Sequence, residues 1–182
     1  MPPATSIRTL LAIGRHRLSL GRIAEVVDLV CAHPRRVEQL MECLWDDDQG
    51  VVNRAAQAAE ELSRYSPALV QPWKTALLGL LAEATENKLR WSLALIVPRL
   101  HLSAAECQRA AAILHTYLED PSSIVKTFAL QGLADLARQD PALGAQVLDL
   151  LRLHSRSGTP AMRARCRILL KAIEQEGAAG TQ

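Results

Sequence analysis

The chain has 182 residues, of which 49% are hydrophobic and 22% charged, with a formal net charge of +2. This length and composition suit one domain or one short array with a continuous core. The sequence pI of about 8.5 argues against strong nucleic-acid binding, because such domains usually have a pI above about 9 and clustered basic residues. Leu and Ala, which favour helices, dominate over the few aromatic residues. The composition therefore predicts an all-α fold.

Cysteine spacing and hydropathy indicate the compartment. The cysteines at 31, 43, 107 and 166 have no CxxC spacing and lie singly in helix-like segments, so we expect reduced, buried thiols rather than disulfides. The first residues lack both a strong apolar stretch and a cleavage site of the kind found in signal peptides. No run of about 18 uncharged apolar residues occurs, so no membrane span is predicted. These features predict a cytoplasmic protein.

Two helices are predicted within residues 1–33, without the pattern that follows them, and we interpret them as an N-terminal capping pair. From residue 34 onward, two kinds of helix alternate. Helices of the first kind are predicted at 35–45, 68–84, 103–119 and 142–154. Helices of the second kind carry apolar residues at +4, +7, +8 and +11 from their starting residues, which are Val51, Leu89, Val125 and Met162.

The starts of the second helices lie 38, 36 and 37 residues apart. A repeat of this length, with each unit too small to bury its own apolar face, indicates a stacked array of helix pairs. Signals at the helix ends agree with this division. Ser103 and Glu106 form a predicted capping box, and Asp140 and Thr159 each precede a proline at a predicted helix start. Pro98 should end its helix early.

The repeat resembles a known family most clearly in "EDPSSIVKTFALQGLADLARQDP", residues 119–141. An acidic loop followed by an apolar and a basic residue at the start of the second helix is similar to HEAT repeats of the armadillo-like superfamily, over about residues 34–175. The resemblance implies a right-handed α-α superhelix, a HEAT-like solenoid of about four helix pairs: 34–66, 67–101, 102–140 and 141–175. Residues 176–182 would form a flexible tail. The resemblance to HEAT repeats also implies ion pairs between Asp120 and Lys126 and between Glu86 and Arg90.

Motifs for catalysis or cofactors are not found in the sequence. The histidines are scattered, and neither metal-ligand spacings nor nucleotide-binding glycine motifs occur. The three acids at 46–48 precede a helix, and we interpret them as a loop and a helix cap rather than a cation site. We therefore expect no enzymatic activity, no cofactor and no metal.

The second helices line the concave face of such arrays, which these proteins use for binding. Their side away from the apolar stripe carries the predicted partner-binding residues: Asn53, Gln57, Trp91, Leu95, Thr127, Leu130, Gln131, Arg167 and Lys171. Trp91 and Leu95 lie one helical turn apart, with Leu130 and Ile168 on the following units. This arrangement predicts a partly apolar groove that holds a protein segment, with Trp91 as its anchor. Alternatively, packing between repeats buries these apolar residues.

Two further interpretations remain at this stage. Arg163, Arg165 and Arg167 could contact nucleic-acid phosphates, as HEAT-like DNA glycosylases do along a basic concave surface, although Glu60 is the only acid predicted on that face and no catalytic motif is recognisable. An enzyme accessory unit on the same fold is the other, with no residues to assign to it. Exposed end helices would allow homo-oligomers.

Overall fold

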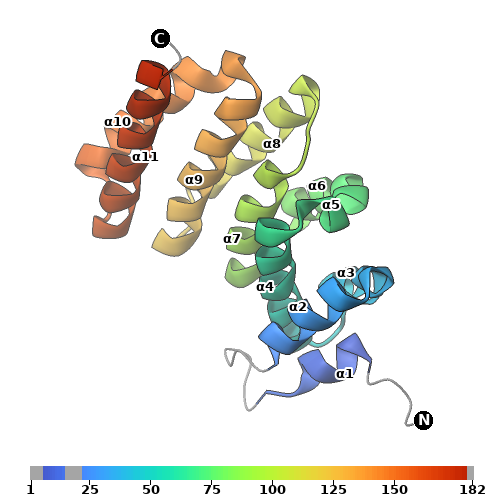
Figure 1. The fold of residues 1–182 in the computed structure, drawn as a ribbon. Helices are drawn as coiled ribbons and strands as arrows, with labels where there is room; N and C mark the ends of the chain where they lie inside the picture. The colour runs from blue at the N-terminus through green and yellow to red at the C-terminus, as the bar shows by residue number, and fades with distance from the viewer. Residues whose placement is uncertain (1–5, 15–21, 180–182) are drawn as a thin grey trace. The chain divides into compact units, whose positions relative to one another are not determined.

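The computed structural model describes residues 6–14 and 22–179, and all regular secondary structure in these ranges is helical (Figure 1). The predicted all-α fold is therefore confirmed. The chain divides into two compact units, the N-terminal unit Met1–Leu100 and the C-terminal unit His101–Gln182. Parts of the predicted cap, at 1–5 and 15–21, and the end of the predicted tail, at 180–182, lie outside the described residues. No helix in the described ranges is long and apolar enough to cross a membrane.

The N-terminal unit is organised around one central helix. Its described α-helices are α1 (Ile7–Ala12), α2 (Ile23–Ala32), α3 (Val37–Glu42), α4 (Gln49–Tyr65), α5 (Pro67–Val70), α6 (Lys74–Glu83) and α7 (Asn87–Ile96). Short 3-10 turns join them: η1 (Pro34–Arg36), η2 (Cys43–Trp45), η3 (Gln71–Trp73) and η4 (Val97–Arg99). Helices α1, α2, α3, α5 and α7 all pack against α4. The core of this unit therefore surrounds α4.

Helix α4 begins and is buried as its sequence predicts. The Asp48 carboxylate accepts hydrogen bonds from the backbone N–H groups of Gly50 and Val51, at 2.7 and 3.4 Å. This confirms the interpretation of the acids at 46–48 as a loop and cap. The apolar stripe from Val51 to Leu62 is fully buried. Arg54 is also buried, and its Nε donates to the carbonyl of Leu11, which ties α4 to the end of α1.

Two prolines interrupt the predicted helices of the N-terminal unit. The helix expected at 68–84 is divided into α5 and α6 by the turn η3, which contains Pro72. A proline has no backbone N–H and clashes with the preceding helical turn, so the helix cannot continue regularly through it. Helix α7 ends at Ile96, and Pro98 lies in the turn that follows. The predicted early end is therefore confirmed, whereas the break at Pro72 was not predicted.

The C-terminal unit contains four long helices: α8 (Ala104–Tyr117), α9 (Ser123–Gln139), α10 (Gly144–Ser157) and α11 (Pro160–Ala179), with the turn η5 (Pro141–Leu143) before α10. The predicted capping box of Ser103 and Glu106 is present at the start of α8. Asp140 caps the turn η5, where its side chain accepts from the backbone of Ala142. Helix α11 continues beyond residue 175, so the first four residues of the predicted tail are helical.

Helices α9 and α11 lie side by side, α8 packs against α9, and α10 packs against both (Figure 1). Residues 37 positions apart occupy matching places. Val125 and Met162 are both buried, as are Ala129 and Cys166. The shared hollows described below join the N-terminal halves of α9 and α11 to each other, and likewise their C-terminal halves. The two helices therefore run in the same direction.

The ion pairs implied by the resemblance to HEAT repeats are not formed. Lys126 and Glu86 have no ion-pair partner within residues 6–14 and 22–179. The Asp120 carboxylate accepts from the backbone N–H of Ser122 at 2.7 Å, and Arg90 Nε donates to the carbonyl of Ala84, also at 2.7 Å. Asp120 and Arg90 thus contact the local backbone rather than their predicted partners.

Candidate functional site

A shallow groove lies between the N-terminal halves of α9 and α11, with a volume of about 380 Å³. We call it the α9–α11 groove, and its lining residues are Ile124, Thr127, Phe128, Ala161, Ala164, Arg165 and Ile168. Large aliphatic side chains are usually buried, yet Ile124 is 54% exposed and Ile168 is 62% exposed. The small side chains of Ala161 and Ala164 leave room between the larger ones. The groove is therefore an exposed, largely apolar surface.

Arg165 crosses the groove from α11 to α9. Its guanidinium carbon lies 5.7 Å from the centre of the Phe128 ring, within the range of a cation–π contact. Its Nη1 donates to Oε1 of Gln131 at 3.1 Å. The Gln131 amide nitrogen in turn donates to both carboxylate oxygens of Asp135, at 3.0 Å each. This chain of contacts holds the Arg165 side chain in one orientation.

The surroundings of the groove are basic. Arg163, which donates to the Gly158 carbonyl at 3.2 Å, is half-buried, whereas Arg167 and Lys171 are exposed. The segments 160–173 and 123–134 contain no acidic residue. Within the described part of the chain, no acid forms an ion pair with the cations of α11, which are Arg163, Arg165, Arg167 and Lys171. The N-terminal ends of two parallel helices add further positive potential.

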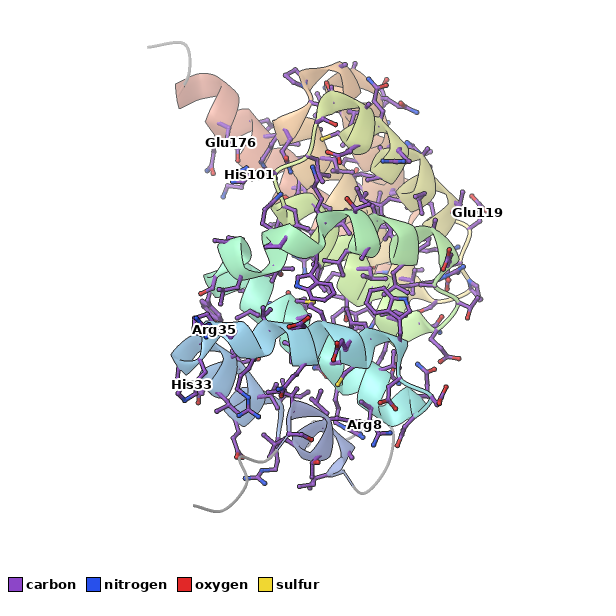
Figure 2. All side chains as sticks on the ribbon, turned by 90° about the vertical axis from the view of Figure 1, so that its right-hand side faces the viewer. Arg8, His33, Arg35, His101, Glu119 and Glu176 are labelled. Atoms are coloured by element: carbon purple, nitrogen blue, oxygen red, sulfur yellow. The ribbon has the colours of Figure 1, made fainter. Side chains whose placement is uncertain are left out.

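The other end of the same two helices is different. A second hollow of about 520 Å³ is lined by Ala134, Ala137, Arg138, Gly144, Val147, Leu148, Ile173 and Glu176. Figure 2 shows Glu176, on α11, and Glu119, just before α9, at opposite ends of the C-terminal unit. In this second hollow, Arg138 pairs with Asp135 at 2.7 Å and with Glu176 at 3.1 Å. At this end of the two helices the cation is paired with acids, whereas at the α9–α11 groove the cations of α11 form no ion pair within the described residues.

In the C-terminal unit, the predicted binding residues separate into two groups. Thr127 lines the groove with only 7% of its surface exposed, Gln131 holds Arg165, and Arg167 and Lys171 are exposed on α11. Leu130 is fully buried, so its side chain is unavailable to a partner. Its place at +5 from Val125 turns it toward the neighbouring helices.

The sequence named half of the residues that meet at the groove, Thr127, Gln131, Arg165 and Ile168, and missed Ile124, Phe128, Ala161 and Ala164. The groove residues share the offsets −1, +2, +3 and +6 from the start of each apolar stripe: Ile124, Thr127, Phe128 and Gln131 on α9, and Ala161, Ala164, Arg165 and Ile168 on α11. The predicted face used +2, +5, +6, +9 and +13, so it shares +2 and +6 with the groove and lacks −1 and +3. Ile124 and Phe128 could have been noticed as large apolar residues just beside the stripe.

The predicted binding residues of the N-terminal unit offer little exposed apolar surface. Asn53 is buried and accepts from Gln49 Nε2 at 3.2 Å, and Leu95 is buried on α7. Gln57 and Trp91 are half-buried. The Oε1 atom of Gln57 has no hydrogen-bond partner in the described residues. Leu95 is thus covered, as the alternative interpretation predicted, whereas Trp91, the predicted anchor, keeps part of its surface exposed.

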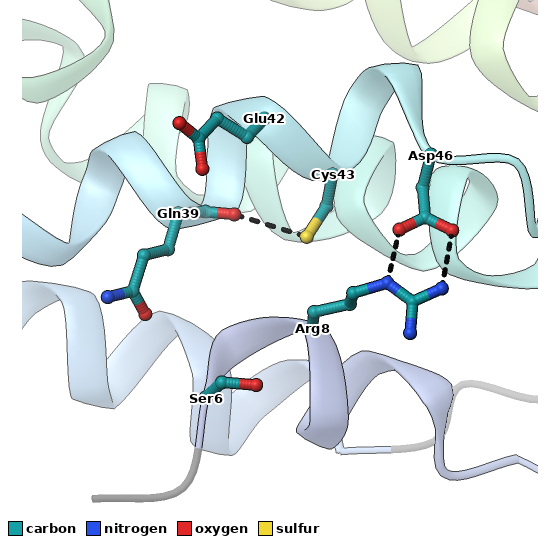
Figure 3. A pocket seen from close by; sticks show the side chains of 6 residues that line it. All are labelled: Ser6, Arg8, Gln39, Glu42, Cys43 and Asp46. Atoms are coloured by element: carbon teal, nitrogen blue, oxygen red, sulfur yellow. Dashed lines mark hydrogen bonds and ion pairs between the residues drawn. The ribbon is translucent and has the colours of Figure 1, made fainter.

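A further hollow of about 240 Å³ in the N-terminal unit is lined by Ser6, Arg8, Gln39, Glu42, Cys43 and Asp46 (Figure 3). Arg8 forms a two-pronged ion pair with Asp46, with Nε–Oδ2 at 2.5 Å and Nη2–Oδ1 at 3.0 Å. Hydrogen bonding from Arg8 lowers the pKa of Asp46. The Cys43 thiol donates to the Gln39 carbonyl at 3.1 Å. These contacts join α1 to the end of η2.

The chemistry of this hollow does not suit nucleophilic catalysis. Burial raises the pKa of the Cys43 thiol to about 11, so the thiol stays protonated at neutral pH. A thiolate, rather than a thiol, is the nucleophile in cysteine enzymes. The ion pair with Arg8 also keeps Asp46 in its charged form, as a structural contact. We interpret the hollow as a packing feature of the N-terminal unit.

The state of Cys43 leads to a testable difference between cysteines. All four are free thiols, but Cys31 is exposed, contrary to the expectation that all would be buried. At pH 8, only about one Cys43 in a thousand would be a thiolate, because its pKa lies about three pH units higher. We expect iodoacetamide to label Cys31 at least tenfold faster than Cys43, measured by peptide mass spectrometry. In urea the two rates should converge, and equal rates in the folded protein would contradict the prediction.

Within the described ranges, no group of three or more His, Cys, Asp or Glu side chains could hold a metal ion. Comparison of the sequence with the models of known protein families finds no match. Comparison with curated protein sequences also finds no match.

Proposed function

We propose that the chain is a HEAT-like array of helix pairs that serves as a non-catalytic interaction scaffold and holds a segment of a partner protein in the α9–α11 groove. The repeat of 36 to 38 residues supports the array, as does the packing of second helices side by side, α4 with α7 and α9 with α11. A right-handed superhelix is the arrangement we propose for the repeats. The free cysteines favour a reducing compartment, and we propose the cytoplasm.

The observation that carries this proposal is the exposure of Ile124 and Ile168 at one hollow between two helices. Complete burial of an isoleucine side chain contributes about 1.5–3 kcal/mol, so burying the exposed parts of both contributes roughly 2–4 kcal/mol. Micromolar affinity requires about 8 kcal/mol. A partner segment would therefore use the apolar groove together with polar contacts around it. This is the usual composition of a protein interface, with an apolar centre and a polar rim.

Nucleic-acid binding is the second candidate, and the same residues favour it less. Proteins that bind DNA with high affinity typically neutralise about 6–10 phosphates. On α11, Arg163, Arg165, Arg167 and Lys171 supply four cations at the groove, fewer than that number, and only Arg167 and Lys171 are exposed. Exposed isoleucines serve no purpose in phosphate binding. The balance of apolar and basic groups therefore favours a protein segment.

The proposal can be tested by selecting binders from a displayed random-peptide library on the whole protein. The variant Ile168→Asp places a charge in the groove, whereas Leu153→Asp makes the same change at a similarly exposed residue, 57% exposed, on α10 outside the groove. We expect selected peptides to bind Ile168→Asp at least tenfold more weakly than wild type, measured by fluorescence anisotropy. Binding to Leu153→Asp should be unchanged.

Two results would count against a protein-binding groove. One is a set of peptides that bind both aspartate variants as well as they bind wild type. The other is an absence of selected peptides combined with binding of a labelled DNA duplex that weakens with salt and with Arg167→Ala. The second result would support the nucleic-acid interpretation instead.

A further inference from the structure

We propose that the segment held in the α9–α11 groove is acidic, and that Arg165 is the specificity-determining residue that receives one of its carboxylates. This inference rests on the proposed function, because it concerns the chemistry of the same groove. Beyond that function, it specifies the charge of the partner segment and the residue that binds its carboxylate. Three features of the groove favour an acidic partner: the local charge, the orientation of Arg165 and the spacing of the exposed isoleucines.

The first feature is the positive charge at the groove, which no acid in residues 6–14 and 22–179 pairs with. The cations of α11 near the groove form no ion pair with an acid of the described chain, whereas Arg138, at the other end of α9, pairs with two acids. The two ends of the same helix pair therefore differ in charge balance. Complementary charge on a partner steers association and excludes partners of like charge. An acidic segment is the partner that this surface fits.

The second feature is that the side chain of Arg165 is already held in position before a partner binds. Its side chain lies over the Phe128 ring, and Gln131, itself held by Asp135, accepts from one of its N–H groups. A guanidinium has five N–H groups in a rigid fork, which matches the two oxygens of a carboxylate. None of the other four donates to a residue in the described ranges. Because the side chain is already positioned, little rotamer freedom would be lost when a carboxylate binds.

The third feature is the spacing of the two exposed isoleucines along the groove. The exposed side chain of Ile168 lies one helical turn after Arg165, and Ile124 lies one turn before Phe128. Residues three or four positions apart on a helix lie on the same face. Arg165 and Phe128 are thus flanked along the groove by exposed isoleucines. The matching ligand is a short amphipathic segment that places an Asp or Glu beside apolar residues, a common form of recognition in a helical groove.

The test uses peptides selected on the whole protein, synthesised with and without a fluorescent label. We expect them to be enriched in Asp and Glu, and we expect replacement of the critical Glu by Gln to weaken binding to wild type at least tenfold. For the variant Arg165→Gln, the same replacement of Glu by Gln in the peptide should change the affinity by less than twofold. Arg165→Lys should restore only part of the affinity, because Lys lacks the fork. Arg152→Gln, an exposed α10 residue paired with Asp149, is the matched control and should bind as wild type does.

The outcomes separate the two proposals. In one outcome, neutral peptides as a class bind wild type as tightly as acidic peptides do and bind Ile168→Asp more weakly. This result would contradict the proposal of an acidic partner, but it would still support a protein-binding groove. Failure to find any peptide sensitive to Ile168→Asp would overturn the proposed function itself. Circular dichroism of each variant checks that it is folded. If Arg165→Gln is unfolded, Lys171→Gln on the exposed face of α11 should still weaken acidic peptides, by two- to threefold, and an unchanged affinity would contradict the inference.

Discussion

Replacing Leu130 with alanine is expected to destabilise the C-terminal unit by about 3 kcal/mol, within the range for truncating a fully buried leucine. Leu130 is fully buried in α9, and its removal would leave a cavity that the surrounding helices fill only in part. The matched change on the groove surface, Ile168→Ala, should cost less than about 0.5 kcal/mol, because that side chain is mostly exposed. The two variants would therefore separate the two effects: Leu130→Ala changes stability, whereas a change at Ile168 affects binding with little effect on stability.

The effect of Leu130→Ala is best measured by hydrogen–deuterium exchange of peptides from residues 123–139. All three tryptophans, at 45, 73 and 91, lie in the N-terminal unit, so their fluorescence does not report on α9. We expect amide protection in α9 to fall by about a hundredfold, the equivalent of 3 kcal/mol. Unchanged protection would show that Leu130 is not part of the core. It would restore Leu130 as a candidate for contact with a partner.

The substitution Glu60→Gln is expected to destabilise the N-terminal unit by about 2–3 kcal/mol. The Glu60 carboxylate, 8% exposed, accepts from Arg99 at 2.8 Å and from Arg64 at 2.9 Å. Removing one member of a buried ion pair typically costs about 3–5 kcal/mol, because the remaining charge loses its partner. Arg99 is 24% exposed and keeps its bonds to the Glu60 carbonyl and to Ser63, so the lower value is expected here.

Urea unfolding followed by tryptophan fluorescence measures this loss, because the tryptophans report on the N-terminal unit. Glu61→Gln is the matched control: it removes the same charge at the next position of α4, where the side chain is half-buried and has no ion pair in the described chain. We expect the control to change the free energy of unfolding by less than about 0.5 kcal/mol. Equal shifts for the two variants would show that the contact between α4 and η4 contributes little.

Much of the local structure follows from the sequence. Apolar spacing placed α4, α7, α9 and α11 correctly, because burial of one face is recorded in the positions of the residues along each helix. Capping at Ser103 and Asp140 was predicted because a cap involves groups only a few residues apart. The end of α7 before Pro98 follows from the chemistry of proline alone. The break at Pro72 could have been read from the same rule.

The binding face was harder to predict. The sequence identified Thr127, Gln131, Arg167 and Lys171 as lying outside the apolar stripe, but it also assigned Leu95 and Leu130 to that face. Both are buried, because each second helix packs against another second helix as well as against a first helix, which widens the buried surface beyond a single stripe. The width of that surface depends on how closely the helices approach, and this is not encoded in the periodicity of one helix.

The sequence by itself therefore determined the helical class, the repeat of 36 to 38 residues and most helix ends, since each depends on interactions between residues close in the chain. Only the tertiary structure decided that Ile124 and Phe128 on α9 meet Arg165 and Ile168 on α11 at one groove. These residues belong to helices that begin 37 residues apart, and their proximity results from the parallel packing of those helices. The unpaired positive charge of the groove likewise depends on which acids the fold brings near, and the fold places Asp135 and Glu176 at Arg138 instead.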